Sequence, residues 1–159
     1  MDKKYLAVLA LVAAVSAGAG YLISHPPAFP VDGIPCEAME AQGFHIHAHL
    51  ELWKGGRPVP IPAGIGIVGG CFYWLHTHTP DGILHVEAPA DRQFTLSQFF
   101  AVWGSSAPQP DPGSKVWIDQ GQGFQPYEGD WENIVLTDKE KISIGPPGLP
   151  EPFLFPEGL

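Results

Sequence analysis

The chain has 159 residues, of which 8 are basic and 17 are acidic, so its formal net charge at pH 7 is -9. This length is enough for one domain with short appendages. The acidic balance disfavours nucleic acids and anionic lipid surfaces as partners, so we expect no nucleic-acid binding, and it is compatible with the attraction of cations.

An uncharged apolar stretch at residues 5–23 follows two lysines near the N-terminus. Its length fits either a single membrane-spanning helix or a secretory signal peptide, and the small residues Ala17 and Ala19 allow cleavage after Ala19. In both interpretations the positive N-terminus stays inside and the rest of the chain is exported. We therefore expect residues 1–24 to be a membrane anchor or signal peptide. The remainder is then a single-pass domain outside the cytoplasm or, after cleavage, a periplasmic or secreted protein.

Prolines dominate both flanks of the expected domain. Residues 25–43 favour a stiff linker without a helix, and the globular domain is expected at residues 44–145. The tail at residues 146–159 is too rich in proline for a helix or an inner strand. Its apolar residues Phe153 and Phe155 would cover a groove on their own domain, bind a protein partner, or belong to a disordered terminus.

The chain has two cysteines, Cys36 and Cys71. Outside the cytoplasm such a pair most often forms a disulfide. A thiolate metal ligand is the alternative, but a regular strand would point Cys71 away from the face of His76 and His78. We expect a Cys36–Cys71 bridge that ties the segment before the first histidine strand to the start of the second.

Strict alternation of apolar and polar residues from Phe44 to Trp53 predicts a β-strand with one buried face. The other face carries His45, His47 and His49. A glycine pair follows and suits a two-residue hairpin turn. Three prolines at every second position of the return strand remove the N–H groups of one lateral side, which predicts an edge strand.

The second histidine-rich stretch predicts another hairpin, which turns at the sequence TPDG. Turn chemistry favours a glycine bulge that pairs His85 with Thr77, whereas a four-residue loop would pair His85 with His76. The second register gathers the histidines and Glu87 on one face and the apolar residues on the other. Because one buried face usually decides register, we include His85 among the candidate ligands.

Residues 95–103 form the one good helix candidate of the domain, with a capping box made by Thr95 and Gln98 and a stop at Gly104. The fold class is therefore mainly β, a small sandwich or part-open barrel with one short helix. Three short strands are expected after the helix, at residues 115–119, 133–137 and 140–144.

Six of the seven histidines lie at alternating spacing in these two stretches. Imidazoles on one face of neighbouring strands predict a metal site, and a pH-responsive histidine cluster is the alternative. Glu51 and Glu87 could be further ligands, acceptors that fix a histidine tautomer, or a general base. The candidate metal ligands are His45, His47, His49, His76, His78 and His85.

Histidine nitrogens suit copper, zinc, nickel or iron, whereas calcium and magnesium prefer oxygen. Cu(I) carriers outside the cell commonly use methionine, and Met39 is the only methionine in the part expected to be exported. Cu(II) binds nitrogen sites more tightly than Zn(II). We expect copper, with zinc or iron as alternatives.

The motifs HxHxHLE, CFYWLHTHTPDGILHVE and FTLSQFFAVWG resemble a group of uncharacterised exported or membrane-anchored archaeal and bacterial proteins, over about residues 44–145. This resemblance implies export but brings no function. A looser resemblance is to the cupins, whose HxHxxxE motif is matched by His45, His47 and Glu51. His85 could take the place of the later cupin histidine, but the flanking glycines of that motif are absent.

Three functions are compatible with these features. A membrane-tethered module would store or deliver metal, or support a membrane partner. A metalloenzyme would use three histidines, an open metal position, and Glu51 or Glu87 as base. A structural or assembly subunit would use the histidines to stabilise a hairpin or to bind metal between subunits, and its tail to dock on a partner.

Overall fold

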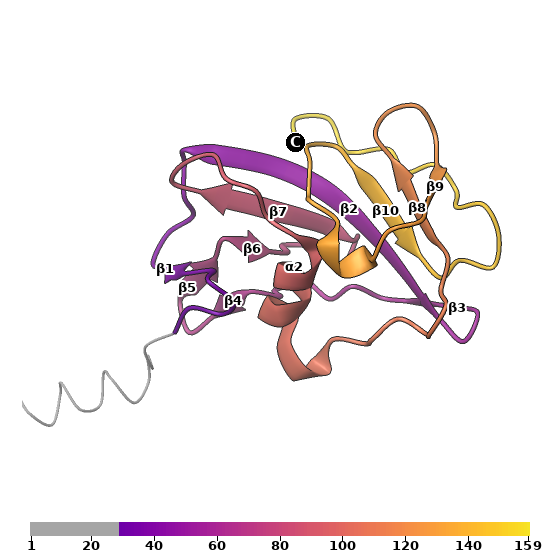
Figure 1. Cartoon of the computed structure of the whole chain (residues 1–159). Helices are drawn as coiled ribbons and strands as arrows, with labels where there is room; N and C mark the ends of the chain where they lie inside the picture. The colour runs from indigo at the N-terminus through magenta and orange to yellow at the C-terminus, as the bar shows by residue number, and fades with distance from the viewer. Residues whose placement is uncertain (1–28) are drawn as a thin grey trace, which may run out of the picture.

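The computed structural model describes residues 29–159 (Figure 1). The expected anchor or signal peptide at residues 1–24 lies outside the described residues. Within residues 29–159, no helix combines the length and the apolar character needed to cross a membrane.

The described chain is mainly β, as expected, with ten strands and one α-helix. The strands form a three-stranded and a seven-stranded sheet, and neither of these sheets closes into a barrel (Figure 1). The elements in chain order are β1 (Cys36–Glu37), β2 (Phe44–Lys54), β3 (Arg57–Val59), β4 (Ile67–Val68), β5 (Cys71–Tyr73), β6 (Leu75–His76), β7 (Ile83–Ala88), α2 (Leu96–Trp103), the 3-10 turn η1 (Gly104–Ser106), β8 (Val116–Asp119), β9 (Gln125–Tyr127), the 3-10 turn η2 (Trp131–Asn133) and β10 (Lys141–Ile144).

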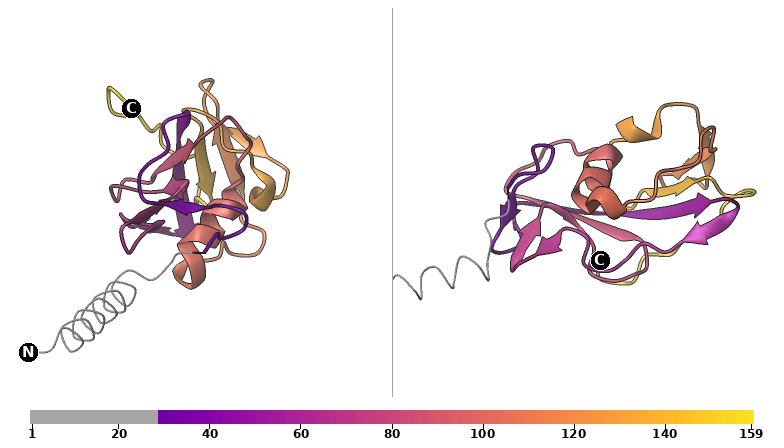
Figure 2. Two further views of the ribbon diagram at one scale, coloured as in Figure 1. Left: turned by 90° about the vertical axis from the view of Figure 1, so that its left-hand side faces the viewer. Right: turned by 90° about the horizontal axis from the view of Figure 1, so that it is seen from below.

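The long strand β2 is the centre of the larger sheet, whose order is β6-β7-β2-β10-β8-β9, with β3 paired to the far end of β2. β7 lies antiparallel on one side of β2, and β10 lies parallel on the other. Helix α2 and the C-terminal end of the chain lie on opposite sides of this sheet (Figure 2). Each face of β2 is therefore covered by a different part of the protein.

The glycine pair after β2 forms the expected tight hairpin. Gly55 and Gly56 have φ of 57° and 72°, the left-handed values that a type I′ turn needs and that glycine adopts without strain. β3 returns antiparallel to β2 and has no second partner among the described strands. The prediction of a proline-bearing edge strand is confirmed.

The register of the second hairpin follows the hydrophobic pattern and not the glycine bulge. His76 pairs with His85, and His85 in turn pairs with His47 across β7 and β2. The alternative pairing of His85 with Thr77 is therefore wrong. The bulge would have moved the apolar residues of β7 out of the core, and that loss outweighs turn preference.

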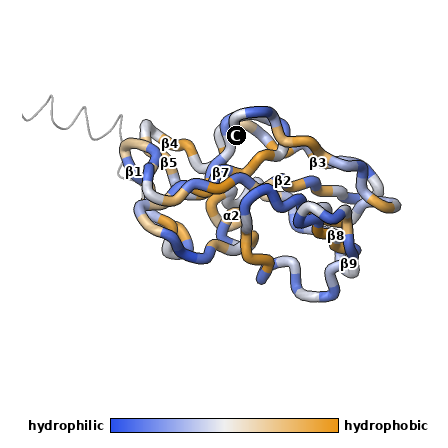
Figure 3. The backbone as a smooth tube through the Cα atoms, turned by 90° about the horizontal axis from the view of Figure 1, so that it is seen from above, coloured by the Kyte–Doolittle hydropathy of each residue, from blue (hydrophilic) through white to orange (hydrophobic). Residues whose placement is uncertain are grey.

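The apolar face of β2 packs into a single core with the helix. Ala48, Leu50 and Leu52 are buried in one cluster with Leu96 and Phe99 of α2. Hydrophobic residues, drawn in orange in Figure 3, occur along the whole described chain and are not collected at one end. Because the apolar face of β2 packs against the helix, its polar face is turned away from the helix. The capping prediction also holds, because the Thr95 N–H donates to Oε1 of Gln98 over 3.1 Å.

The expected strand at residues 133–137 does not form. The 3-10 turn η2 covers its start, and Thr95 and Val135 make one isolated bridge. Ile134 and Leu136 are buried at alternating positions, as in a strand. However, this segment pairs with the residues that lead into α2, and their extended backbone ends where the helix begins at Leu96. β9 was not predicted, since its three residues carry no clear alternating pattern.

Part of the segment expected to be a linker belongs to the folded unit. Ile34 is 0 % exposed, and β1 pairs antiparallel with β5. The predicted disulfide joins Cys36 to Cys71, with their Cα atoms 5.6 Å apart. Because its ends are fixed in this way, the chain between β1 and β2 is held close to the start of the second hairpin.

Candidate metal centre

Three adjacent strands bring five of the six candidate histidines together. His45 and His47 come from β2, and His85 comes from β7. His76 ends β6, and His78 follows it in the loop. Because His85 pairs with both His47 and His76, its imidazole stands in the middle of a row that runs across the sheet.

These side chains fall into two ligand groups. Within each group, one ligand atom from every residue lies within 4.8 Å of all the others. We call the first the carboxylate group and the second the imidazole group. The carboxylate group is His76, His78, His85 and Glu87, and the imidazole group is His45, His47 and His85.

The carboxylate group is compact. Nε2 of His76 is 3.1 Å from Nε2 of His78, and Oε1 of Glu87 is 3.9 Å from Nε2 of His76. Nδ1 of His85 is 3.6 Å from the same carboxylate oxygen. A metal ion at the centre of these four atoms would need only small side-chain movements to bring each donor to about 2 Å.

The imidazole group lies on the other side of His85. The ring centroids of His45 and His47 are 4.5 Å apart, and those of His47 and His85 are 4.6 Å apart. Nε2 of His45 also lies 3.2 Å from Oε1 of Glu87. Glu87 therefore adjoins both groups and supplies negative charge between them.

Donor atoms of this cluster are buried without hydrogen-bond partners. They are Nε2 of His47, Nδ1 of His85 and Oε2 of Glu87. An unpaired buried polar atom costs about 1–3 kcal/mol, so three in one place call for a ligand that satisfies them. A cation does so for lone pairs on nitrogen and oxygen alike.

Burial keeps several of these imidazoles neutral. It lowers the pKa of His47 to about 4 and the pKa of His85 to about 3, helped by neighbouring histidines. Burial also lowers the pKa of His76. Neutral imidazole is the form that binds metal. These three side chains are therefore ready to act as ligands at pH 7 without first losing a proton.

Glu87 has the opposite shift. Its burial, together with the nearby carboxylate of Glu40, raises its pKa to about 7. In the absence of a cation, ionisation of the Glu87 carboxyl therefore costs free energy. A metal ion beside the carboxylate would offset that cost and expel the proton.

Glu40 is the site residue that sequence reasoning missed. Its Oε1 lies 3.1 Å from Nε2 of His78 and 3.8 Å from Nε2 of His76. It stands between β1 and β2, in the segment expected to be a linker. The available signal was the disulfide, because a bridge from Cys36 to Cys71 brings this acidic segment to the strand that precedes His76.

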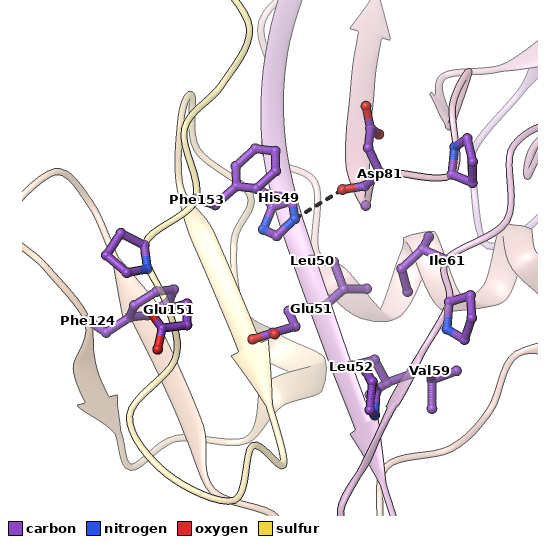
Figure 4. A pocket seen from close by; sticks show the side chains of 15 residues that line it. His49, Leu50, Glu51, Leu52, Val59, Ile61, Asp81, Phe124, Glu151 and Phe153 are labelled. Atoms are coloured by element: carbon purple, nitrogen blue, oxygen red, sulfur yellow. Dashed lines mark hydrogen bonds between the residues drawn. The ribbon is translucent and has the colours of Figure 1, made fainter.

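His49 does not join either ligand group. Its ring stacks on Phe153 of the tail at 3.6 Å between centroids, and its Nε2 donates to the carbonyl of Asp81 over 3.1 Å. It lines a pocket of about 360 Å³ between β2, the loop before β7 and the tail (Figure 4). His49 pairs with Ile83, the first residue of β7, and β6 does not extend that far.

Glu51 is also separate from the cluster. Its Oε2 accepts a 2.6 Å hydrogen bond from the Ser143 hydroxyl of the neighbouring strand β10. Glu51 belongs to neither ligand group among the described residues. The set His45, His47 and Glu51, on which the cupin resemblance relied, therefore does not converge here, whereas Glu87 does stand at the cluster.

No protein-family model, curated protein or solved structure matches this chain at a significant level. The function of the protein is therefore inferred from the chemistry of the site.

Proposed function

We propose that this protein is an extracytoplasmic metal-binding protein that holds Cu(II) at the histidine cluster and stores it or delivers it to a membrane partner. The observation that supports this most directly is the set of buried, unpaired donor atoms on His47, His85 and Glu87. Neutral imidazoles around a carboxylate form a site prepared for a cation, since their desolvation has already occurred in the folded protein.

The donor set favours a borderline transition metal. It offers imidazole nitrogen and carboxylate oxygen, and both cysteines are committed to the disulfide. Met39 is 77 % exposed and is not one of the clustered side chains. With neither thiolate nor thioether, Cu(I) has no soft ligand here. Cu(II) is preferred over Zn(II) by the Irving–Williams order, and zinc or iron would take the site where copper is scarce.

The location outside the cytoplasm is supported by two independent features. The disulfide between Cys36 and Cys71 suits an oxidising compartment. The apolar stretch at residues 5–23, preceded by lysines, has the character of an export signal or anchor. As an anchor, it would keep the metal site beside the membrane and its partner.

A metalloenzyme is the second candidate, favoured by one observation. Glu87 has a pKa of about 7, which is the range in which a carboxylate exchanges protons efficiently at neutral pH. Beside a metal-bound water it would act as a general base. This role requires Glu87 to remain free of the metal, whereas the storage function uses it as a ligand.

The test is a calorimetric titration of the untagged, metal-free protein with Cu(II) and with Zn(II). The double variant His47→Ala, His76→Ala removes one imidazole from each ligand group. High-affinity binding should be lost while the melting temperature of the metal-free protein stays within a few degrees. His49→Ala is the matched control, because it removes an imidazole of the same strand outside both groups. Unchanged affinity in the double variant would exclude the cluster as the metal site.

A further inference from the structure

The cluster contains more donors than one ion uses. Five imidazoles converge with two carboxylates, which are those of Glu40 and Glu87. Protein-bound zinc takes about four or five ligands. Seven donor side chains around one ion would leave several buried groups unpaired, and that is costly.

The two ligand groups share His85 and no other member. Each also has its own buried atom without a partner, namely Nε2 of His47 in the imidazole group and Oε2 of Glu87 in the carboxylate group. One cation cannot lie at the centre of both. The unpaired atoms therefore mark two positions, with the His85 ring between them.

We propose that the cluster is a dinuclear centre in which the His85 ring bridges two metal ions. This rests on the proposed metal-binding function and extends it. Nδ1 of His85, which faces Oε1 of Glu87 at 3.6 Å, binds the ion of the carboxylate group. Nε2, on the opposite edge of the ring, binds the ion held by His45 and His47. A neutral imidazole has one ring proton, which is released to solvent when the second ion binds.

The two positions differ in charge, so they fill in order. The carboxylate group has Glu87 as a member and Glu40 at 3.1 Å from His78. The imidazole group has no carboxylate member, and the nearby charges of Lys139 and Asp138 oppose one another at His47. The first ion therefore enters the carboxylate group, and the second enters the imidazole group with lower affinity.

Titration of the full-length protein with Cu(II), followed by native mass spectrometry and electron paramagnetic resonance, tests the proposal. We expect two equivalents to bind. The first should give an ordinary isolated Cu(II) spectrum, and the second should convert it to that of a coupled pair, with loss of the isolated signal. A bridging imidazole transmits exchange coupling, which removes the isolated signal, whereas close ions on separate ligands only broaden it through space.

Variants assign each position. His45→Ala with His47→Ala should reduce the stoichiometry from two to one and preserve the isolated spectrum. His76→Ala with His78→Ala should also leave one equivalent, with a changed spectrum. His49→Ala should keep two coupled ions, and circular dichroism verifies that each variant is folded.

The outcomes separate the two proposals. One equivalent at saturation, or two equivalents without coupling, overturns the bridged pair and leaves the metal-binding function intact. The absence of any tight Cu(II) or Zn(II) binding overturns both.

Discussion

Nδ1 of His76 donates a 2.9 Å hydrogen bond to the carbonyl oxygen of Tyr73. A carbonyl only accepts, so the proton of neutral His76 is on Nδ1, and Nε2 presents its lone pair to the cluster. Tyr73 lies in β5, which pairs with β1 on one side and with β4 on the other. The strand pair that carries the disulfide thus also fixes the tautomer of a metal ligand.

Removal of the disulfide should therefore weaken both the fold and the metal site. Replacing Cys36 and Cys71 by Ser frees a loop of 35 residues, which costs about 4 kcal/mol in the chain-entropy model. The loosened segment carries Glu40, and β5 carries the carbonyl that orients His76. We expect a lower melting temperature and, at a temperature where the variant is still folded, a weaker metal affinity.

Glu40→Gln is the control for this prediction, because it removes the charge and keeps the bridge. It should lower metal affinity with little change in melting temperature. A serine variant that melts at the wild-type temperature would show that the bridge does not restrain the fold. Melting curves with and without reductant give the same comparison in the wild-type protein.

Metal affinity should depend on pH through Glu87 between pH 7 and pH 5. The pKa of its carboxyl is about 7, so below pH 7 an incoming ion must displace a proton. The apparent affinity then falls about tenfold per pH unit. His47 and His85, with pKa values of about 4 and 3, add further proton competition only below that range.

Calorimetric titrations of wild-type protein and the Glu87→Gln variant at several pH values test this assignment. The variant should bind more weakly at pH 7.5, and its affinity should fall less steeply toward pH 5. Equal slopes for the two proteins would assign the proton competition to another group.

The faces of the sheet could be predicted from the sequence, because alternation along Phe44–Trp53 directly reports burial. The hydrophobic pattern also favoured the register that pairs His76 with His85, and this pairing is found. The alternation of side chains between the two faces of a strand therefore correctly placed His45 and His47 with the second hairpin. These successes concern period and pairing, which are local properties of strands.

The sequence predicts less about the segments that connect the strands and the helix, and about which residues these segments contact. Parity places His49 with its neighbours, but only the extent of β6 and the position of Phe153 decide that its ring leaves the cluster. Glu40 stands in an irregular segment with no periodicity, and its approach to His78 depends on a long-range disulfide. The bridge between Thr95 and Val135 is limited by the start of a helix and not by strand propensity.

His49 should make the protein less stable in acid. Its pKa is lowered to about 4, chiefly by burial, from an ordinary value of 6.5. Between these values the unfolded chain binds a proton at this position and the folded chain does not. Stability is thus fully present above pH 6.5 and falls as the pH drops toward 4, by about 3 kcal/mol at most.

Denaturant unfolding of the wild type and His49→Phe between pH 8 and pH 4 tests this. Phenylalanine keeps the stack on Phe153 but loses the hydrogen bond to Asp81, which lowers stability at pH 8 by about 1 kcal/mol. The decline below pH 6.5 should nevertheless be smaller in the variant. A decline equal to that of the wild type would mean that His49 does not contribute to acid sensitivity.

The tail should stabilise its own domain through Phe153. This ring stacks on His49 at an interplanar angle of 9°, and Phe155 lies under Nζ of Lys139, 4.9 Å from its ring centroid. Aromatic pairs contribute about 0.5–1.5 kcal/mol beyond the area they bury. Deleting residues 147–159 should therefore lower the melting temperature by several degrees, and Phe153→Ala should reproduce most of that loss.

Leu154→Ala is the matched control, since the side chain of Leu154 is 86 % exposed and its removal should leave the melting temperature unchanged. A truncated protein that melts like the wild type would show that the tail does not stabilise the domain in solution.

The same truncation addresses the proposed membrane partner. Phe153 already stacks on His49 of its own domain. A partner that uses the tail must therefore either displace Phe153 from His49 or bind the exposed Leu154. In the first case Phe153→Ala weakens co-purification of the partner, and in the second Leu154→Ala does.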